Sequence, residues 1–441
     1  MKKKYKLLFI QPSPYDSAGN VIKKKRLYFV GLTFPLLAAM TPDHWTVEIY
    51  LETIEDIPFD TDADLIGIGT MGHAVHRSID IANEFKERGK TIITGGYMAS
   101  LMQDEAMEYS DSVIVGDADL AWPQVLEDFE NGTLKKQYDV PLTEYDPPLP
   151  RYELLLDKSI GDFLPVQAAR GCPHACTFCS VYCLYRRRYH KRSIESVMRD
   201  IKHVKSLGFK KFLLLDDNLV ADPEYAKALC NEIAKLKMQW FSQCSITLSN
   251  NDELLKAVAR SGCVGLSFGL ESITQDSMNA MGKSWSKVSD YSSQLKKIRK
   301  AGIDVSTEMV VGADGDTLDS IRSTAQFIQN NHVVVPRFYI LTPIPGTDFH
   351  TEMLAQDRII NTDYFTYDST SAVHAPKNMT ADELTEAYWQ LYRDVFRIPN
   401  ILTRTIFHSG FLKHPIRHLF YLMVNLYYKH QISQRITPNI I

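Results

Sequence analysis

The sequence predicts an α/β protein in three regions. An N-terminal doubly wound, Rossmann-like domain is expected over residues 1–145, a partial (β/α)6 barrel over 146–350, and a helical C-terminal region over 351–441. Three observations lead to this prediction. Short apolar runs alternate with amphipathic helical stretches as far as residue 347, prolines cluster between residues 141 and 150, and no strand-like run follows residue 348. Such alternation is typical of parallel sheets with crossover helices.

The first domain is expected to hold five strands, at residues 5–10, 46–51, 64–70, 91–94 and 112–115. Helices are expected between them, at residues 32–40, 74–88, 102–109 and 122–130. Glycine or Asn-Gly follows several of these stretches and supports the helix ends. Ligands of doubly wound sheets bind beyond the carboxyl ends of the strands. The candidate ligand-binding residues at those ends are Thr70, Met71, Gly72, His73, Gly95, Gly96, Tyr97 and Gly116.

Six strand–helix units are expected in the second region. The strands are predicted at residues 163–168, 212–216, 240–246, 264–268, 304–311 and 337–342, and the helices at 194–207, 223–237, 252–261, 288–301 and 318–330. Parallel units of this kind form barrels whose active sites lie at the carboxyl ends of the strands. Residues with catalytic or ligand-binding side chains are therefore expected at those ends.

Composition narrows the class of protein. The chain of 441 residues is too long for one core, and 45% hydrophobic with 23% charged residues is typical of globular proteins. A net charge of −4 gives no general attraction to nucleic acid. An odd count of seven cysteines favours the reducing cytoplasm over a disulfide scaffold. No apolar stretch reaches the ~18 residues that a membrane-spanning helix needs.

The C-terminal tail has an unusual charge pattern. No Asp or Glu occurs from Val395 to Ile441, while basic and aromatic residues recur throughout. One interpretation is a helix lying on anionic lipid, which would bring the protein to the inner face of the membrane. The simpler interpretation is a helix packed on the barrel with a basic outer face.

Three cysteines carry the strongest functional signal. Cys172, Cys176 and Cys179 have the spacing C-x3-C-x2-C and follow the predicted strand at 163–168. Three thiolates on one loop can hold three irons of a cubane iron–sulfur cluster and leave the fourth iron open to a small molecule. The alternatives are a zinc site or three unrelated thiols. Structural zinc sites usually add a second ligand pair downstream, and the sequence has none.

This motif resembles that of the radical S-adenosylmethionine (SAM) family. The resemblance implies a [4Fe–4S] cluster whose open iron binds SAM, and cleavage of SAM to methionine and a 5′-deoxyadenosyl radical. In that family the residue before the last cysteine, here Phe178, packs on the adenine.

Further resemblances to this family fall at the ends of later strands, at Asp216, Asp217, Asn218, Glu271, Ser272 and Gly312. The first three resemble the site for the SAM amino group, and the next two resemble the G-x-E-S segment that binds the ribose or the methionine carboxylate. The glycine resembles the adenine-binding strand, although the family form G-x-P-G-E-T reads Gly-Ala-Asp-Gly-Asp-Thr here. One arginine of residues 186–192 is expected to clamp the SAM carboxylate. Helix capping is the structural alternative for the carboxylates and for Ser272.

A doubly wound domain before such a barrel resembles the cobalamin-binding branch of the family, whose class B methyltransferases include enzymes that methylate hopanoid lipids. The resemblance implies cobalamin at the strand ends of the first domain. One SAM then methylates the cobalt and another provides the radical. The D-x-H-x-x-G sequence that supplies an axial histidine elsewhere is absent. Water, Met71 or His73 could take the lower axial position, and a domain without corrinoid is the alternative.

We therefore expect a cobalamin-dependent radical SAM enzyme that methylates an unactivated carbon of a natural-product or lipid-like substrate. Its cofactors carry the difficult chemistry and the protein aligns them. A flavodoxin or ferredoxin is the expected electron donor. Radical cyclisation, rearrangement or carbon–carbon coupling without methyl transfer is an alternative, and so is a non-catalytic iron–sulfur sensor or scaffold.

Overall fold

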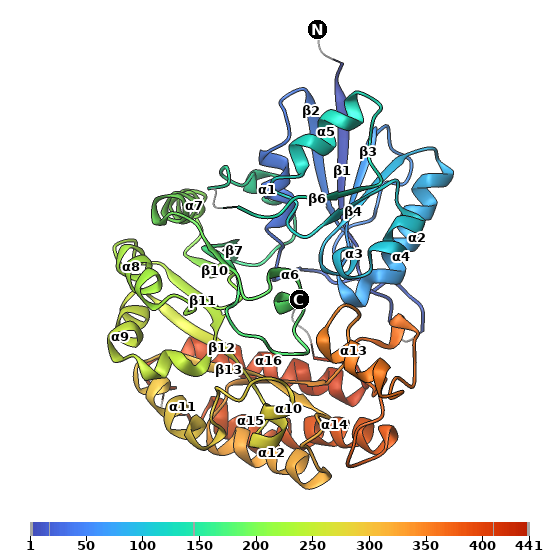
Figure 1. The fold of residues 1–441 in the computed structure, drawn as a ribbon. Coiled ribbons are helices and arrows are strands. Elements are labelled where there is room, and N and C mark those ends of the chain that lie inside the picture. Colours follow the sequence, from blue (N-terminus) through green and yellow to red (C-terminus); the bar gives the residue numbers. More distant parts are fainter. Residues whose placement is uncertain (1–2, 17, 144–145, 409, 439–441) are drawn as a thin grey trace. The chain divides into compact units, whose positions relative to one another are not determined.

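The computed structural model describes residues 3–16, 18–143, 146–408 and 410–438. The chain forms two compact units (Figure 1). The first unit comprises residues 1–165 with 190–203, and the second comprises 166–189 with 204–440. The C-terminal helices thus belong to the same unit as the cysteine loop. The finer division at residues 145 and 350 stays a prediction.

The first unit is built on a six-stranded sheet in the order β2-β1-β3-β4-β5-β6. Its strands are β1 (Tyr5–Gln11), β2 (Trp45–Leu51), β3 (Leu65–Gly69), β4 (Thr91–Gly95), β5 (Ser112–Val115) and β6 (Gln137–Asp139), and all neighbours pair in parallel. The expected count of five strands was wrong, because the edge strand β6 has the polar sequence Gln-Tyr-Asp and no apolar run. The strand order reverses at β1, so the crevice between β1 and β3 is the topological switch point.

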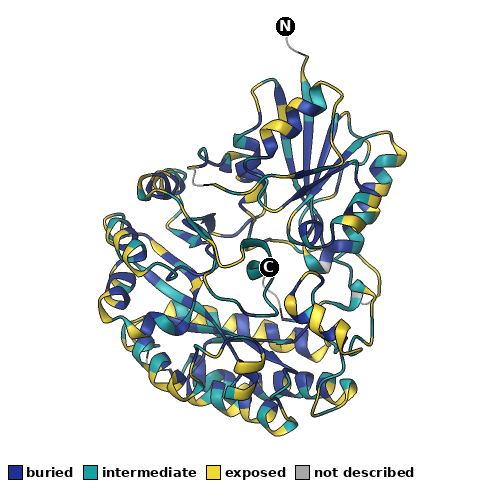
Figure 2. Ribbon diagram, in the orientation of Figure 1, coloured by how far each residue is buried: buried dark blue, intermediate teal, exposed yellow. Residues whose placement is uncertain are grey.

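The central strands of this sheet are buried on both faces. Leu7 and Leu8 in β1, like Leu65 and Ile66 in β3, are fully buried, as parallel sheets covered by helices require. The covering helices are α1 (Thr33–Ala39), α2 (Val75–Glu87), α3 (Tyr97–Leu101), α4 (Gln103–Tyr109) and α5 (Trp122–Glu130). Figure 2 shows these strands dark, with helices that are exposed on one side only. The alternation of apolar runs with amphipathic stretches therefore predicted the buried strands of this sheet and the helices that cover them.

A second sheet has the order β14-β13-β12-β11-β10-β7, which follows the chain, and its strands β10 to β14 belong to the second unit. Its strands are β7 (Phe163–Val166), β10 (Lys211–Leu214), β11 (Gln239–Cys244), β12 (Cys263–Glu271), β13 (Asp304–Val311) and β14 (Val335–Ile340). Strands β10 to β14 pair in parallel. Two short strands, β8 (Ala169–Gly171) and β9 (Tyr189–Lys191), flank the cysteine loop and form a separate pair.

Helices follow the strands of this second sheet. They are α6 (Ser180–Tyr185), α7 (Ile194–Ser206), α8 (Pro223–Ala234), α9 (Asp252–Arg260), α10 (Gln275–Ala280), α11 (Tyr291–Lys300) and α12 (Leu318–Asn330). Their caps agree with the sequence: the Asp222 side chain accepts from Tyr225 N–H to start α8, and Thr317 caps α12. The structure agrees with the helix starts predicted at residues 194, 223, 252 and 318, whereas α11 begins at Tyr291, three residues after the predicted start.

The C-terminal region forms four helices: α13 (Asp348–Ala355), α14 (Ala381–Val395), α15 (Ile398–Thr405) and α16 (Pro415–Ser433). Helix α14 is attached to strand β14 through Tyr392, whose hydroxyl donates to the Phe338 carbonyl at 3.0 Å. The same hydroxyl accepts from Phe338 N–H at 3.0 Å. None of the helices within the described ranges has both the length and the hydropathy needed to cross a membrane.

Candidate functional site

The three cysteines of the C-x3-C-x2-C motif lie on one tight loop between β8 and α6 of the second unit. Cys176 is buried and Cys172 and Cys179 are half-buried. The Cys179 N–H donates to the Cys176 carbonyl at 3.1 Å, so a turn brings these two residues together. Burial raises the pKa of the Cys176 thiol to about 12 and that of Cys179 to about 11, and the charge of Cys172 adds to both effects. The thiols therefore form one electrostatically coupled group.

The donor chemistry of this loop fits an iron–sulfur cluster. Thiolates are the ligands that such clusters use, and N–H groups near the sulfurs tune them. The Asn218 amide nitrogen lies 3.7 Å from the Cys172 sulfur. Within the described ranges, no three His, Cys, Asp or Glu side chains converge as ligands of a single metal ion would. A cubane cluster gives each thiolate its own iron, so its ligands need not converge in that way.

Asp216 and Asp217, both predicted to bind SAM, accept hydrogen bonds from the backbone that leads into this loop. The Asp216 Oδ1 accepts from the N–H groups of Ala168 and Ala169, at 2.8 and 3.2 Å. The Asp217 Oδ2 accepts from Gly171 N–H at 2.7 Å. Both carboxylates therefore fix the backbone just before Cys172. Their expected contact with the SAM amino group stays a prediction.

Asn218 connects the loop to the next strand. Its side chain is buried, and its Oδ1 accepts from Ser245 N–H at 3.0 Å at the end of β11. Its Nδ2 points to the Cys172 sulfur. The Asn218 side chain thus links Cys172 to the end of β11. An amide suits this position because it carries both a donor, which faces the sulfur, and an acceptor, which binds the Ser245 N–H.

Residues 281–285 contact the cysteine loop through hydrogen bonds and ring stacking. None of them was predicted from the sequence as a site residue. Thr177 N–H donates to the Met281 carbonyl at 3.1 Å. Gly282 has φ +70°, and a Cβ there would lie 2.8 Å from the Ala175 carbonyl oxygen, so only glycine allows this approach. The His174 ring stacks on Trp285 with 3.7 Å between centroids. Burial lowers the pKa of His174 to about 4, which keeps this ring neutral.

A buried ion pair lies against this support. The Lys283 Nζ donates to Glu271 Oε1 and to the Gly269 carbonyl, each at 2.6 Å, and lies 5.5 Å from the Trp285 ring centre. The positive charge of Lys283 lowers the pKa of the Cys176 thiol, against the larger effect of burial. Lys283 is the main site residue that sequence reasoning missed.

The predicted residue Glu271 has an unusual backbone. Its φ is +61°, in the left-handed region, and the pairing of β12 with β13 shifts register between Gly269 and Glu271. A Cβ at Gly269 would lie 2.5 Å from the Glu271 Oε1. A non-glycine residue in this conformation costs roughly 1–3 kcal/mol and is typical of functional sites. The glycine, the irregular register and Lys283 together hold the carboxylate in place.

Ser272 and Gly312 both donate hydrogen bonds to the carboxylate of Asp316. Asp316 was not among the predicted site residues. The Ser272 hydroxyl donates to Asp316 Oδ1 at 3.2 Å, and Asp316 Oδ2 accepts from the N–H groups of Gly312 and Ala313, at 2.9 and 3.2 Å. Burial raises the pKa of Asp316. At Gly312, where φ is +96°, a Cβ would lie 2.5 Å from Leu384 of α14.

Other predicted residues of this site are placed as follows. Phe178 is half-buried next to Cys179. Two arginines of the run 186–192 have carboxylate partners: Arg186 lies 3.5 Å from Asp348, and Arg192 lies 2.8 Å from Asp200. The arginine expected to bind SAM is therefore not identified by its geometry.

In the first unit, four predicted residues meet at the carboxyl edge of the sheet. Thr70 N–H donates to the Gly95 carbonyl at 2.8 Å, and a Cβ at Gly96, where φ is +106°, would lie 2.8 Å from the Thr70 carbonyl oxygen. The Ser100 hydroxyl donates to the Gly96 carbonyl at 2.8 Å and accepts from Gly116 N–H at 2.9 Å. A Cβ at Gly116 would have no atom within 4 Å. The open space at Gly116 leaves room beside this edge for a bound group.

The loop after β3 holds three more predicted residues. Met71 is 49% exposed, and Gly72 starts the short 3₁₀ turn Gly72–Ala74. The His73 side chain lies outside the described part of the structure. Tyr97 begins α3 and follows Gly96 at the end of β4. Met71 and Tyr97 thus lie in the segments that follow the carboxyl ends of β3 and β4.

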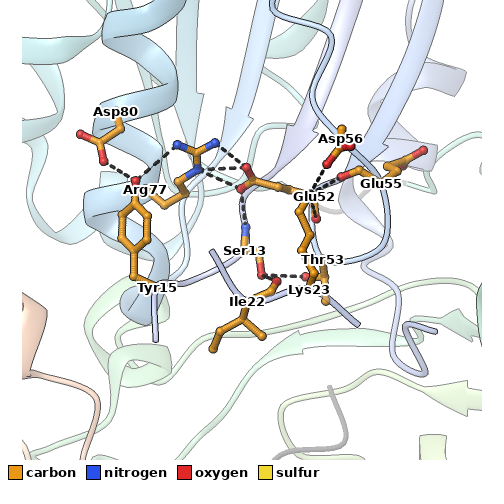
Figure 3. Close-up of polar contacts among 10 residues, drawn as sticks. All are labelled: Ser13, Tyr15, Ile22, Lys23, Glu52, Thr53, Glu55, Asp56, Arg77 and Asp80. Carbon is orange, nitrogen blue, oxygen red and sulfur yellow. Dashed lines mark hydrogen bonds and ion pairs between the residues drawn. The ribbon is translucent and has the colours of Figure 1, made fainter. Parts of the chain in front are cut away.

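The loop after β1 is fixed by a buried ion pair that the sequence did not reveal (Figure 3). Glu52 is buried, and its Oε1 accepts from Arg77 Nη2 at 2.5 Å. The Glu52 Oε2 accepts from Ser13 N–H at 2.9 Å. Arg77 also donates to the Tyr15 hydroxyl at 3.3 Å, and Tyr15 donates to Asp80 at 2.5 Å. These hydrogen bonds and the ion pair therefore hold the loop after β1, which borders the switch point of the sheet.

Comparison with known proteins gives concordant results. The family model of the Radical SAM superfamily matches residues 166–328. The chain is 28% identical to the bacteriochlorophyllide d C-12(1)-methyltransferase of Chlorobaculum tepidum, over 91% of this chain and 90% of that protein. It is 30% identical to the C-8(2)-methyltransferase of the same organism, over 84% of this chain and 86% of that protein.

A solved structure has the same fold. The radical SAM methyltransferase TsrM from Kitasatospora setae, determined with cobalamin and a [4Fe–4S] cluster bound, aligns with a TM-score of 0.67. The alignment covers 97% of this chain and 100% of TsrM at 14% sequence identity. At this identity the likeness concerns the fold.

Proposed function

Because this chain belongs to the radical SAM superfamily and, within it, to the family of the bacteriochlorophyllide methyltransferases, we propose that it methylates an unactivated carbon of a small molecule. The observation that carries the proposal is the loop with Cys172, Cys176 and Cys179, which fits a cluster with one open iron. Both relatives are named as methyltransferases of bacteriochlorophyllide d. A natural-product or lipid-like substrate is therefore the class to test.

The residues are proposed to divide between two cofactor sites. The three cysteines would hold the [4Fe–4S] cluster. The proposed SAM site is lined by Phe178, Asp216, Asp217, Asn218, Glu271, Ser272 and Gly312, and the proposed cobalamin site by Thr70, Met71, Gly72, His73, Gly95, Gly96, Tyr97 and Gly116. When bound, these groups supply a 5′-deoxyadenosyl radical and a transferable methyl group.

The chain itself contributes positioning. Asp216 and Asp217 hold the backbone before the cysteine loop, and Lys283 holds Glu271 in its left-handed conformation. In a site already shaped by such contacts, a cofactor loses little freedom on binding and the reacting groups are aligned in advance. Lys283 is thus a positioning residue in this proposal.

The surroundings of the enzyme are part of the proposal. We place it in the reducing cytoplasm, because all seven cysteines are free thiols and the cluster ligands must stay reduced. A flavodoxin or ferredoxin would deliver the electron. The second unit would correspond to a partial barrel of six strand–helix units, and the C-terminal region would contact the inner face of the membrane.

The test is anaerobic reconstitution with iron, sulfide and hydroxocobalamin, followed by desalting. We expect about one corrinoid per chain by visible absorbance, and formation of both 5′-deoxyadenosine and S-adenosylhomocysteine from SAM under reduction. An intact cluster without retained corrinoid would refute the cobalamin assignment, and absence of SAM cleavage would refute the enzyme.

A matched pair of thiol variants sharpens this test. Cys176→Ala is expected to lose the cluster. Cys183→Ala is the control, because Cys183 lies one helical turn past Cys179 and its thiol donates to the Gly346 carbonyl at 3.2 Å. Equal iron content in the two variants would contradict the assignment of the ligands.

A further inference from the structure

Helix α16 leaves a stripe of large apolar residues in solvent while it buries polar residues. Its buried positions are His418, Val424, Asn425, Tyr428, Gln431 and Ile432, of which three are polar. The exposed large hydrophobic residues of the helix are Ile416, Leu419, Phe420, Met423, Leu426 and Tyr427. Surface helices of globular proteins usually bury such an apolar stripe, because its burial stabilises them. The outward apolar stripe of α16 is therefore suited to a partner.

The orientation of this helix is fixed by buried hydrogen bonds. Arg404 of α15 is fully buried, and its Nη2 donates to the Asn425 Oδ1 at 2.6 Å. The Asn425 Nδ2 donates to the Val334 carbonyl at 2.9 Å, just before β14. Rotating α16 to bury its apolar face would leave the Arg404 charge buried without these partners, at a cost of several kcal/mol. The apolar face is thus a stable part of the surface.

A second anchor acts at the N-terminal half of the helix. Arg417 lies 2.7 Å from Asp304 at the start of β13, and Asp304 is buried. The Tyr421 hydroxyl donates to the same carboxylate at 3.1 Å. The two anchors lie on the inward side at both halves of α16, so the whole helix is held in one orientation.

The exposed residues form one continuous stripe. Ile416 is 84% exposed and Met423 62% exposed, and the stripe positions recur every three or four residues, which is one face of a helix. From Ile416 to Tyr427 the stripe spans about 16 Å at ~1.5 Å per residue, and no charged side chain lies on it. Leu412 and Phe407, in the segment between α15 and α16, are 89% and 73% exposed and add apolar surface. Figure 2 shows the exposed positions along α16.

The charges around the stripe select an anionic partner. Residues 396–441 contain no Asp or Glu, and exposed Lys413 and Lys429 lie beyond the two ends of the stripe. A second copy of the chain would bring lysines toward lysines, whereas paired helices place opposite charges beside their apolar seam. Anionic lipid complements both the apolar stripe and the lysines, and aromatic residues such as Phe420 and Tyr427 are typical of interfacial helices.

The basic outer face expected from the sequence is present only in part. Of the arginines counted there, Arg397, Arg417 and Arg435 form ion pairs with Asp394, Asp304 and Glu386, and Arg404 is buried. The three ion pairs offset part of the positive charge, and Arg404 is held by Asn425 and the Val395 carbonyl. Between the exposed Lys413 and Lys429, the outward face of α16 is mainly apolar.

We propose that this outward face of α16, extended by Leu412 and Phe407, is a membrane-docking surface. Its apolar side chains enter the interface of an anionic bilayer, and Lys413 and Lys429 contact lipid phosphates. The surface is argued from the second unit alone and does not depend on the chemistry of the cysteine loop.

Flotation of the full-length protein with vesicles tests this proposal. We expect binding to phosphatidylcholine vesicles that contain phosphatidylglycerol, and much weaker binding to phosphatidylcholine alone. The double variant Ile416→Ser/Met423→Ser is expected to bind roughly tenfold more weakly or worse, because it removes two apolar side chains from the interface. Lys413→Gln and Lys429→Gln are each expected to cost roughly fivefold, on the anionic vesicles only.

The matched control is Leu354→Ser, an apolar residue of α13 that is 55% exposed and lies off the stripe. It should bind like the wild type. All these positions are exposed, so unchanged thermal midpoints would show that the variants fold. No flotation of the wild type, equal binding to both vesicles, or equal loss in the Leu354→Ser control would overturn the proposal. A dimer by light scattering that the double variant abolishes would assign the face to a second copy instead.

Discussion

The buried ion pair between Lys283 and Glu271 leads to a quantitative prediction. Replacing Lys283 by methionine keeps the length of the side chain and removes its charge. The side chains of both partners are about one-tenth exposed, so the substitution leaves a carboxylate in a poorly solvated site. Breaking a buried pair in this way costs about 3–5 kcal/mol. For a unit of this size the thermal midpoint should fall by roughly 6–20 °C.

Two further variants isolate the pair. In Lys283→Met/Glu271→Gln neither charge remains, so most of the lost stability should return. Lys227→Met is the surface control, because the ion pair of Lys227 with Glu253 is exposed on the Glu253 side. Exposed pairs contribute about 0–1 kcal/mol, so this variant should unfold close to the wild-type temperature.

The assay is thermal unfolding of the four proteins by intrinsic fluorescence, at one pH and ionic strength. A midpoint of Lys283→Met within the range of Lys227→Met would refute the reasoning, because Glu271 would then find solvent or another partner. A double variant less stable than Lys283→Met would refute it as well. In that case the Glu271 carboxylate would contribute through contacts other than Lys283.

Three further predictions concern other parts of the molecule. Replacing Arg77 by methionine leaves Glu52 buried without its cation, and should speed hydrogen–deuterium exchange in the loop after β1 at least about tenfold; unchanged exchange would contradict this. Gly96→Ala should cost roughly 1–3 kcal/mol and reduce corrinoid retention, more than Gly89→Ala, whose added Cβ meets no atom within 4 Å. Burial lowers the pKa of His374 to about 4. Between pH ~6.5 and ~4 the unfolded chain therefore binds more protons than the folded chain, and the free energy of unfolding decreases by up to about 3 kcal/mol as the pH is lowered through this window. His374→Gln should flatten the thermal midpoint over this range; an identical slope would exclude the histidine as the cause.

The sequence was sufficient for the strands and helices wherever burial leaves a local signal. The strand predicted at residues 304–311 is β13 with the same bounds, and half of its residues are β-branched, which favours a strand. The strand predicted at residues 64–70 contains β3, because parallel strands covered on both faces are continuous apolar runs. The strand β6 was missed because an edge strand needs no such run. Helix α3 was missed for a different reason: it is only five residues long and directly follows a glycine.

Side-chain roles depended on partners that are distant in the sequence. Lys283 looks like any surface lysine in its local sequence, and only the fold brings it to Glu271. The Asp216–Asn218 segment was placed correctly at a strand end, yet its hydrogen bonds to the residues before the cysteine loop follow from the pairing of segments some 45 residues apart. Counting charges along the tail was also insufficient, because Arg417 and Arg435 form ion pairs with Asp304 and Glu386, which are distant in the sequence.

The way the cysteine loop is held has a consequence for how the enzyme is repaired. Side chains at the end of β10 and the backbone of Met281 fix the loop through the protein's own hydrogen bonds. In zinc fingers, by contrast, metal binding and folding are a single event. Here the thiols are positioned by the fold, so oxidative loss of iron need not unfold the chain. A damaged molecule can then be restored by fresh iron and sulfide, without synthesis of a new polypeptide.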